Sequence, residues 1–458
     1  MLHIANEKAS DYHRSMDFDT PLPFYALVFS LLFLVAGNAH ANGDIAAPNA
    51  QPTESIQSAL DRETFLRITA GEMLMQQGDV DNGLPLLLKA AATHRDESLY
   101  IRSVDLCIQA KAGGHAIVAT KAWLGAFPHS RDAALRLRQL QLTLGQTADL
   151  GSSLQRLLQL SEPQERISLI RAVPSALSHI AHTSQRVTIG SEGLRHMVQD
   201  AATQHWAVTT IAQLQYDAQQ FQASLGHART ITMSHPEFQP AWFLVMLNMS
   251  KLNMEPRGLS VLTAKPNDND KVVRAKGSAL VQYLRLHQRN DEAYATMEGV
   301  RSRLPQDNDW AYQQAMLADQ LQRFDDMERL LREVIAREPR NAHAINALGF
   351  SFAERNIRLD EALQLTQQAV ALKPDNAQIL DSLGWVQFKM GQLQAAEQTL
   401  AKAMHMQADP EIAAHWGEVL WVLNRKSEAQ AAWKQGLELE PHHLVLLQTI
   451  QRLQQSAP

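Results

Sequence analysis

Four methionines lie close together in the middle of the chain, at Met233, Met246, Met249 and Met254. Thioether sulfurs are soft ligands that suit copper(I), so this grouping raises the question of a copper site. Trp242 and Phe243 belong to the same apolar stretch, however, and methionine commonly fills irregular gaps in hydrophobic cores. We therefore interpret the methionines as core residues, and we expect neither a metal nor a cofactor.

Histidine, cysteine and serine give no stronger sign of catalysis. His442 and His443 directly follow Pro441, so we interpret them as a solvated turn rather than a ligand pair. Neither a His-x-x-x-His nor a His-Glu-x-x-His pair occurs in the sequence. The single cysteine, Cys107, lies in an apolar segment, which favours a buried and inert thiol and excludes an internal disulfide framework. No nucleophile-elbow signature is present either, so we expect no catalytic residues and no enzyme activity.

Aromatic side chains near the C-terminus recur at fixed places. Phe350 and Trp385 each follow a Leu-Gly pair directly, and Phe388 and Trp421 each lie four residues after a glycine of the same series. Aromatic residues are frequent anchors for a bound peptide or helix, but they also pack one repeat against the next. Both roles stay open at this point, and both require elements that repeat along the chain.

The glycines of this series, Gly349, Gly384 and Gly417, are 35 and 33 residues apart. Each glycine is followed, at a nearly constant distance, by a small residue and seven positions later by another. These residues are Ala362, Ala396 and Ala429, and then Ala369, Ala403 and Gly436. A period of about 34 residues indicates stacked helix–turn–helix pairs. The small residues would let the two helices of a pair cross closely.

Other residues mark the turn and the end of each pair. Asn356, Gly391 and Asn424 tolerate left-handed backbone conformations and are predicted to form the turns. Pro374 and Pro441 are predicted to end the second helices, because proline lacks the N–H and clashes with the preceding turn. Several independent features therefore agree on one period.

The segment 341–442 resembles the tetratricopeptide repeat (TPR) family. More narrowly, the motifs Asp-Ser-Leu-Gly-Trp at 381–385 and Asp-Pro-Glu-Ile-Ala-Ala-His-Trp-Gly-Glu at 409–418 are similar to the C-terminal repeats of exported TPR proteins of Gram-negative bacteria. That narrower likeness covers about the last quarter of the chain. The resemblance implies an all-α, right-handed superhelical solenoid of antiparallel helix pairs that acts as a binding scaffold.

The resemblance also implies where a partner would bind, because first-helix positions in this family tend to point toward the concave groove or the neighbouring first helix. The candidate protein-binding residues are Asn346, Phe350, Asp381, Trp385, Phe388 and Trp421. The Lys/Arg pattern of a C-terminal carboxylate clamp is missing, so a chaperone-tail receptor of that type is not expected. Because Glu418 takes the place of Trp385 in the third repeat, we expect a partly exposed aromatic patch that narrows toward the C-terminus.

The chain divides into six expected segments. They are a signal peptide at 1–41, a flexible linker at 42–58, degenerate TPR-like repeats at 59–160, poorly registered helical repeats at 161–270, degenerate TPR repeats at 271–340, and well-defined TPR repeats with a C-terminal capping helix at 341–458. Within the second repeat, at about 97–128, Gly113 and Gly114 are predicted to form the turn.

The N-terminus predicts export. An apolar run of 13 residues at 24–36 is followed by Ala39-His40-Ala41, which reads as a secretory signal peptide cleaved after Ala41. The run is short for a membrane span of about 20 residues. The segment 1–20 is not positively charged, and Met16 is an alternative start. An uncleaved anchor and a buried N-terminal helix in a cytoplasmic protein stay open as alternatives.

Composition and charge exclude some functions. The chain is 45% hydrophobic and 20% charged, as is ordinary for a folded protein, and its net charge of −6 gives no basic footprint for nucleic acid. We expect a periplasmic, non-catalytic scaffold that binds a protein or peptide partner in envelope biogenesis, secretion or outer-membrane assembly. Two alternatives are an envelope enzyme, such as a peptidoglycan or polysaccharide hydrolase with a TPR portion, and a self-associating structural protein that forms a homodimer. An enzyme domain would have to lie within 161–270.

Overall fold

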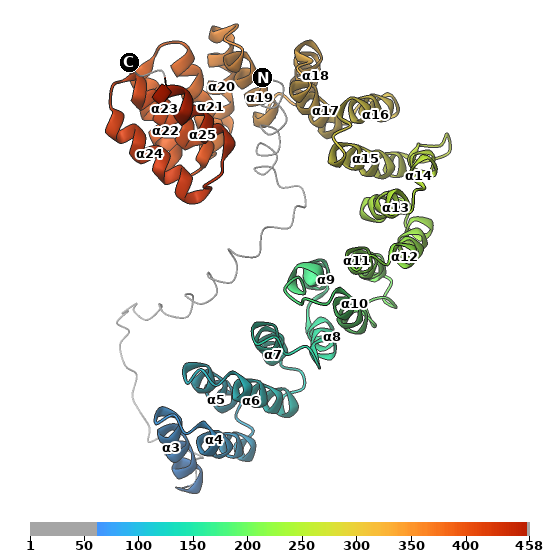
Figure 1. Cartoon of the computed structure of the whole chain (residues 1–458), viewed down its shortest axis with the longest axis vertical. Helices are drawn as coiled ribbons and strands as arrows, with labels where there is room; N and C mark the ends of the chain where they lie inside the picture. Colours follow the sequence, from blue (N-terminus) through green and yellow to red (C-terminus); the bar gives the residue numbers. More distant parts are fainter. Residues whose placement is uncertain (1–61, 456–458) are drawn as a thin grey trace, which may run out of the picture. The chain divides into compact units, whose positions relative to one another are not determined.

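A computed structural model describes residues 62–455 of the chain (Figure 1). The expected signal peptide at 1–41 and the expected linker at 42–58 lie outside the described residues. All regular elements within 62–455 are α-helices, numbered α3 to α25, and most of them pack against the next helix along the chain. The expected all-α solenoid of helix pairs is therefore confirmed. The described helices belong to two compact units, which are divided between residues 263 and 264 of the sequence.

The N-terminal unit contains the helices up to residue 263. They are α3 (Arg62–Gln76), α4 (Val80–His94), α5 (Glu97–Gln109), α6 (Gly113–Ala126), α7 (Arg131–Thr143), α8 (Leu150–Leu160), α9 (Pro163–Ala176), α10 (Thr183–Gly193), α11 (Gln204–Asp217), α12 (Phe221–Ser234), α13 (Gln239–Lys251) and α14 (Glu255–Leu262). The first six form three regular pairs, α3 with α4, α5 with α6, and α7 with α8. The pairing then changes, because α8 packs against α10 as extensively as against α7, and α9 packs mainly against α11.

The predicted turn at Gly113 and Gly114 is wrong. The turn between α5 and α6 lies at Lys111, which has a φ of 55°, and Gly113 already begins α6. A Cβ atom at Gly113 would lie 2.7 Å from both Cδ atoms of Leu144, just after α7. This glycine therefore allows close packing between neighbouring pairs, and a lysine takes the left-handed position that the sequence had suggested for glycine.

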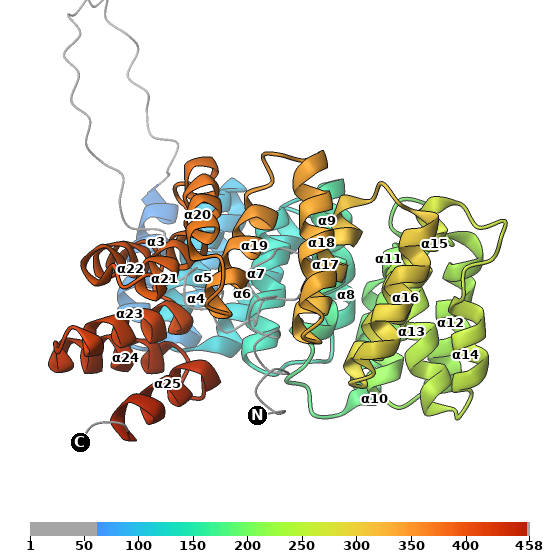
Figure 2. The ribbon, with the colours of Figure 1, turned by 90° about the horizontal axis from the view of Figure 1, so that it is seen from above.

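The C-terminal unit contains five antiparallel pairs and a final helix among its described residues (Figure 2). Its helices are α15 (Asp270–Leu286), α16 (Asn290–Arg303), α17 (Asn308–Gln320), α18 (Phe324–Arg337), α19 (Ala342–Glu354), α20 (Leu359–Leu372), α21 (Ala377–Lys389), α22 (Leu393–Met406), α23 (Pro410–Val422), α24 (Lys426–Leu439) and α25 (Leu444–Gln455). Helix α25 packs against both α23 and α24. It therefore covers the last pair, as a capping helix does.

The turns and helix ends of the last three pairs are where the sequence predicts them. Asn356, Gly391 and Asn424 have φ values of 53°, 75° and 62°. Helix α20 ends at Leu372, two residues before Pro374, and α24 ends at Leu439, two residues before Pro441. The equivalent left-handed positions of the two preceding pairs are held by Gln288 and Gln322, with φ values of 57° and 58°. Glutamine is not a typical turn residue, so these two turns carry little signal in the sequence.

Small residues bring the two helices of each pair together. A Cβ atom at Gly349 would lie 3.0 Å from Cγ2 of Thr366, and one at Gly384 would lie 2.6 Å from Cγ of Leu400. A Cβ atom at Gly417 would clash with the indole of Trp433. The alanines on the facing helices, Ala362, Ala396 and Ala429, are fully buried. The predicted close crossing is confirmed at all three pairs.

We expect Gly384→Ala to lower the free energy of unfolding by about 1–3 kcal/mol, because the added methyl group overpacks the contact between α21 and Leu400. Gly299→Ala is the matched control, since Gly299 lies in α16 with open space around it. There the higher helix propensity of alanine should stabilise the protein by about 0.5–1 kcal/mol. Chemical denaturation of both variants measures the two effects. Equal changes in the same direction would show that Gly384 does not lie at a tight crossing.

Candidate functional site

The last three pairs curve toward their first helices. Helix α19 contacts α21, α21 contacts α23, and α23 contacts α25, whereas the described second helices α20, α22 and α24 have no comparable contacts with one another. Neighbouring first helices therefore lie closer together than neighbouring second helices, so the stack bends with the first helices inside. We call the side formed by α19, α21 and α23 the inner face. All six residues singled out from the sequence belong to these three helices.

His415 of α23 is the point at which three first helices meet. Its buried imidazole lies with Nδ1 2.9 Å from Oδ2 of Asp381 in α21. The ring of Trp385, also in α21, stacks on the imidazole with 4.2 Å between ring centroids and 21° between the planes. Phe350 of α19 also lies nearby, with its ring centroid 6.3 Å from that of His415. His415 therefore takes part in both an ion pair and an aromatic stack.

The surroundings of His415 keep its imidazole protonated. Burial by itself would lower the pKa, since it penalises the charged form. The charge of Asp381 and its hydrogen bond act in the opposite direction, and the carboxylates of Glu411 and Glu354 add to them. The net result raises the pKa of His415 from 6.5 to about 9. The inner face therefore has a buried imidazolium–carboxylate pair at its centre near neutral pH.

Trp385 is buried, with only 6% of its surface exposed, so the prediction that it is partly exposed is wrong. Its ring contacts the rings of both His415 and Phe388, and the centroid of Phe388 is 5.1 Å from that of Trp385. Its Nε1 donates a hydrogen bond of 2.6 Å to Oε1 of Glu354, in α19, and Lys389 Nζ lies 4.8 Å from the ring centroid. Contacts from the neighbouring repeats thus cover both the ring and the indole N–H, which a single repeat could not reveal.

Asn346 and Asp381 are also buried and connect helices beneath the inner face. Asn346 Nδ2 donates a hydrogen bond of 3.0 Å to Oγ of Ser382, so it ties α19 to α21. Asp381 accepts from His415 and ties α21 to α23. These observations give both residues a structural role, and direct contact between either of them and a partner stays a prediction.

Phe350, Phe388 and Trp421 are only partly buried and so retain some accessible ring surface. Phe350 and Phe388 lie beside the His415–Trp385 stack. Trp421 instead packs on Trp433 of α24, with 5.4 Å between ring centroids. The structure therefore brings Phe350, Trp385 and Phe388 together and places Trp421 in a separate cluster with α24 and α25.

His415 was assigned no role from the sequence, although a signal for it was present. His415 follows Asp381 by 34 residues, which is one repeat period. Residues one period apart lie opposite each other in neighbouring repeats, so an acid and a histidine at this spacing predict a contact. Glu354 and Trp385, 31 residues apart, are a second such pair.

The other candidate residues lie only partly where the sequence predicts them. The predicted solvated turn is wrong for His443, which is buried and whose Nδ1 accepts a hydrogen bond of 3.4 Å from the N–H of Leu446, whereas His442 is exposed.

Met246 and Met249 are buried in α13, as expected of core residues, but Met233 is 84% exposed on α12, so its interpretation as a core residue is wrong. Burial raises the pKa of the Cys107 thiol to about 11, which leaves little reactive thiolate near neutral pH. Among the described residues, no three His, Cys, Asp or Glu side chains are grouped so that they could hold a metal ion. No helix within 62–455 is both long and apolar enough to span a membrane.

The stability of the C-terminal unit should fall as the pH rises through about 9. The folded pKa of His415 lies above its unfolded value near 6.5, so the stabilisation is complete below pH 6.5 and is lost as His415 deprotonates. A shift of this size corresponds to about 3 kcal/mol. We expect denaturant unfolding to show this decline in the wild type and to show much less of it in Asp381→Asn, where only the charges of Glu411 and Glu354 still oppose the effect of burial on His415. Identical pH profiles for the two proteins would contradict the assignment.

Comparisons with known proteins also find tetratricopeptide repeat sequence in this chain. Residues 356–415 match the tetratricopeptide repeat family model. A TPR repeat-containing protein of Pseudomonas aeruginosa is 35% identical over 124 residues, which are 27% of this chain and only 21% of that relative. The chain thus matches about a fifth of the length of its relative.

Solved structures share less sequence identity with the chain and have low TM-scores. Yeast Tom70 is 13% identical, with 86% of this chain and 95% of Tom70 covered and a TM-score of 0.37. A thermophilic TPR protein of Thermus thermophilus is 24% identical, with 38% of this chain and 96% of that protein covered and a TM-score of 0.35. Residues 356–415 of this chain are therefore identified as tetratricopeptide repeat sequence, and the close crossings and left-handed turns of the last three helix pairs agree with that match.

Proposed function

We propose that this chain is an exported, non-catalytic scaffold that binds a protein partner on the inner face of its C-terminal TPR repeats. TPR repeats are protein-interaction elements, which supports the general role. The observation that carries the specific site is the pair of partly exposed rings, Phe350 and Phe388, fixed beside the buried His415–Trp385 stack. Aromatic rings held rigidly beside a well-packed centre are the usual anchors of protein interfaces.

The packing below these rings favours binding without rearrangement. Trp385 is held by the stack and by its hydrogen bond to Glu354, and Asp381 and His415 hold α21 against α23. A partner would thus meet a surface that is already ordered, which lowers the entropy lost on association. An amphipathic helix or an extended peptide with apolar side chains suits such a face.

The process we propose is envelope biogenesis, secretion or outer-membrane assembly in the periplasm. The support is the likeness of the motifs at 381–385 and 409–418 to exported TPR proteins, together with the predicted signal peptide. The region where an enzyme domain would have to lie, 161–270, consists mainly of the helices α9 to α14, which favours the scaffold over the hydrolase alternative.

Photo-crosslinking in cells tests the binding face. A photoreactive phenylalanine analogue at position 388 should give a covalent adduct of discrete mass, because Phe388 keeps part of its ring accessible beside the stack. The same analogue in place of Leu439 is the control, since this residue is 53% exposed but lies on α24, a second helix. Gel electrophoresis and mass spectrometry of the adducts provide the measurement.

An adduct at position 388 but not at 439 supports the inner face. Equal adducts at the two positions would point to non-specific contact. Adducts at 439 alone would assign binding to the outer helices and overturn the proposal.

Export is tested on the protein isolated from cell fractions. The apolar run and Ala39-His40-Ala41 predict that the mature chain begins at Asn42 and is recovered in the periplasmic fraction. N-terminal sequencing after fractionation checks both statements. A full-length chain in the cytoplasm would refute export without affecting the binding face.

A further inference from the structure

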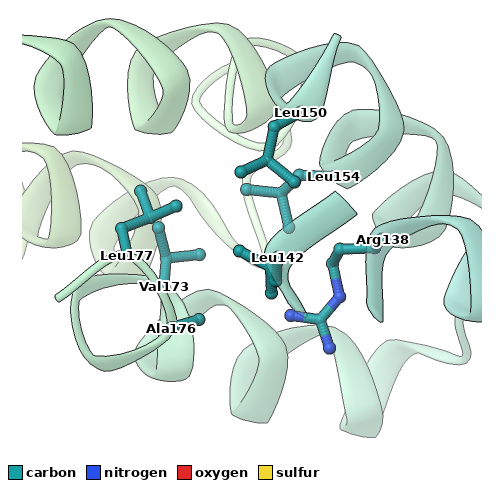
Figure 3. A pocket seen from close by; sticks show the side chains of 7 residues that line it. All are labelled: Arg138, Leu142, Leu150, Leu154, Val173, Ala176 and Leu177. Carbon is teal, nitrogen blue, oxygen red and sulfur yellow. The ribbon is translucent and has the colours of Figure 1, made fainter. Parts of the chain in front are cut away.

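The change in helix pairing after α8 sets the packing around the first turn of α11. Gly193 of α10 faces Leu154 of α8 so closely that a Cβ atom would lie 2.5 Å from Cδ2 of the leucine, so α10 can lie beside α8. Helix α9 packs mainly against α11 and leaves a small cavity among α7, α8 and α9 (Figure 3). The cavity has room for about one water molecule, so we assign it no ligand.

An aromatic cluster with two histidines lies at the start of α11. His205 and Trp206 belong to the first turn of α11, and His235 and Phe238 lie in the turn between α12 and α13. The ring of Phe238 meets both rings of α11 nearly at right angles, with its centroid 4.8 Å from that of His205 and 4.7 Å from that of Trp206. The ring centroids of His205 and His235 are 5.0 Å apart. These four partly buried residues, which we call the His205 cluster, connect α11 to the turn 235–238.

His205 is poorly placed to carry a proton. Its Nδ1 is buried and has no hydrogen-bond partner among the described residues. In the neutral ring this nitrogen can remain a bare acceptor, but in the protonated ring it becomes a buried N–H donor without an acceptor, which is costly. His205 is also the second residue of α11, where the positive end of the helix dipole opposes a cation.

Two charged groups act directly on His205, and they act in opposite directions. Burial lowers the pKa of His205 most, the charge of His235 lowers it further, and the charge of Glu237 raises it. Oε1 of Glu237 lies 3.7 Å from Nδ1 of His235, so the two residues lie side by side in the turn. The turn 235–238 therefore carries one group that opposes protonation of His205 and one that favours it.

The pKa of His205 shows no further contribution from the other elements packed against α11. On the α9 side, the guanidinium of Arg171 lies over the ring of Trp206, 5.1 Å from its centroid. The remaining charged or titratable side chains of α10, α12 and α13 contact other residues or lie at the far end of their helix; they are Arg186, Glu192, His227, Arg229 and Lys251.

We propose that the His205 cluster is a pH-sensitive latch, which holds α11 on the turn 235–238 while His205 is neutral and opens when His205 takes up a proton. In water both ring nitrogens of the protonated imidazole find acceptors, whereas the closed cluster offers none to Nδ1. Opening separates Phe238 from His205 and Trp206, so it exposes aromatic surface within the N-terminal unit.

The sign of the pH dependence follows from the lowered pKa of the closed form. The closed latch is stable above the ordinary His205 value of 6.5 and loses stability as the pH falls below it, because the open form then binds more protons. Proton uptake by an open His205 favours opening by up to about 30-fold at pH 5.

Amide hydrogen exchange of the full chain, followed by mass spectrometry, tests the latch. Peptides that cover 203–208 and 233–240 should lose up to about 30-fold of their protection between pH 7 and pH 5, after correction for the intrinsic exchange rate. Peptides from α7, which contains no histidine, should keep their protection.

Three variants assign the effect to individual residues. His205→Gln cannot take up the proton, so its protection should lose most of its pH dependence. Glu237→Gln removes the charge that favours a proton on the closed His205, so this variant should open at a higher pH than the wild type. His179→Gln removes an exposed histidine of the same unit and should keep the wild-type profile.

Four results would overturn the proposal. They are equal protection of the wild type at the two pH values, wild-type pH dependence in a folded His205→Gln variant, opening of Glu237→Gln at a lower pH than the wild type, and an equal loss of protection in α7, which would mean general unfolding. The melting temperature at pH 7 shows whether His205→Gln folds. If it does not fold, Glu237→Gln decides, because Glu237 is exposed.

Discussion

The close crossing of two helices at small residues is the constraint on which the C-terminal unit depends. Gly384 lies against Leu400 and Gly417 against Trp433, with no room for a Cβ atom at either glycine. Each tight pair presents its first helix to the next pair, and the first helices then approach one another. Asp381 reaches His415 and Glu354 reaches Trp385 only because of that approach. The arrangement of the inner face is thus a consequence of packing several residues away from it.

The sequence predicted the features that depend on contacts within one repeat. It did not reveal the features that depend on contacts between neighbouring repeats. The glycines, alanines, left-handed turns and prolines of α19 to α24 act within a pair, so their residue types were sufficient. Trp385 looked accessible because its own helix does not cover it, but His415 and Glu354 of neighbouring repeats do. The turns at Gln288 and Gln322 could not be predicted, because glutamine is not a typical turn residue. The packing of α10 beside α8, in the place where α9 would be expected, depends on contacts between glycines and leucines that are far apart in the sequence.

Stability alone does not explain a buried ion pair at the centre of a repeat interface, because apolar residues of similar size often stabilise a core at least as well. The Asp381–His415 pair is directional, and a shift of one helix past the other by a turn would separate the two charges. We therefore expect it to fix the register of α21 against α23. The hydrogen bonds from Asn346 to Ser382 and from Trp385 to Glu354 hold α19 against α21 in the same way. Together these contacts keep the inner face rigid, as the proposed binding face requires.

Hydrogen exchange of the protein with and without its captured partner tests the central claim most directly. If the partner binds on the inner face, amide protection should increase in α19, α21 and α23 and stay nearly constant in α20, α22 and α24. Increased protection in the second helices alone, or an even increase over all six helices, would contradict a binding site on the inner face.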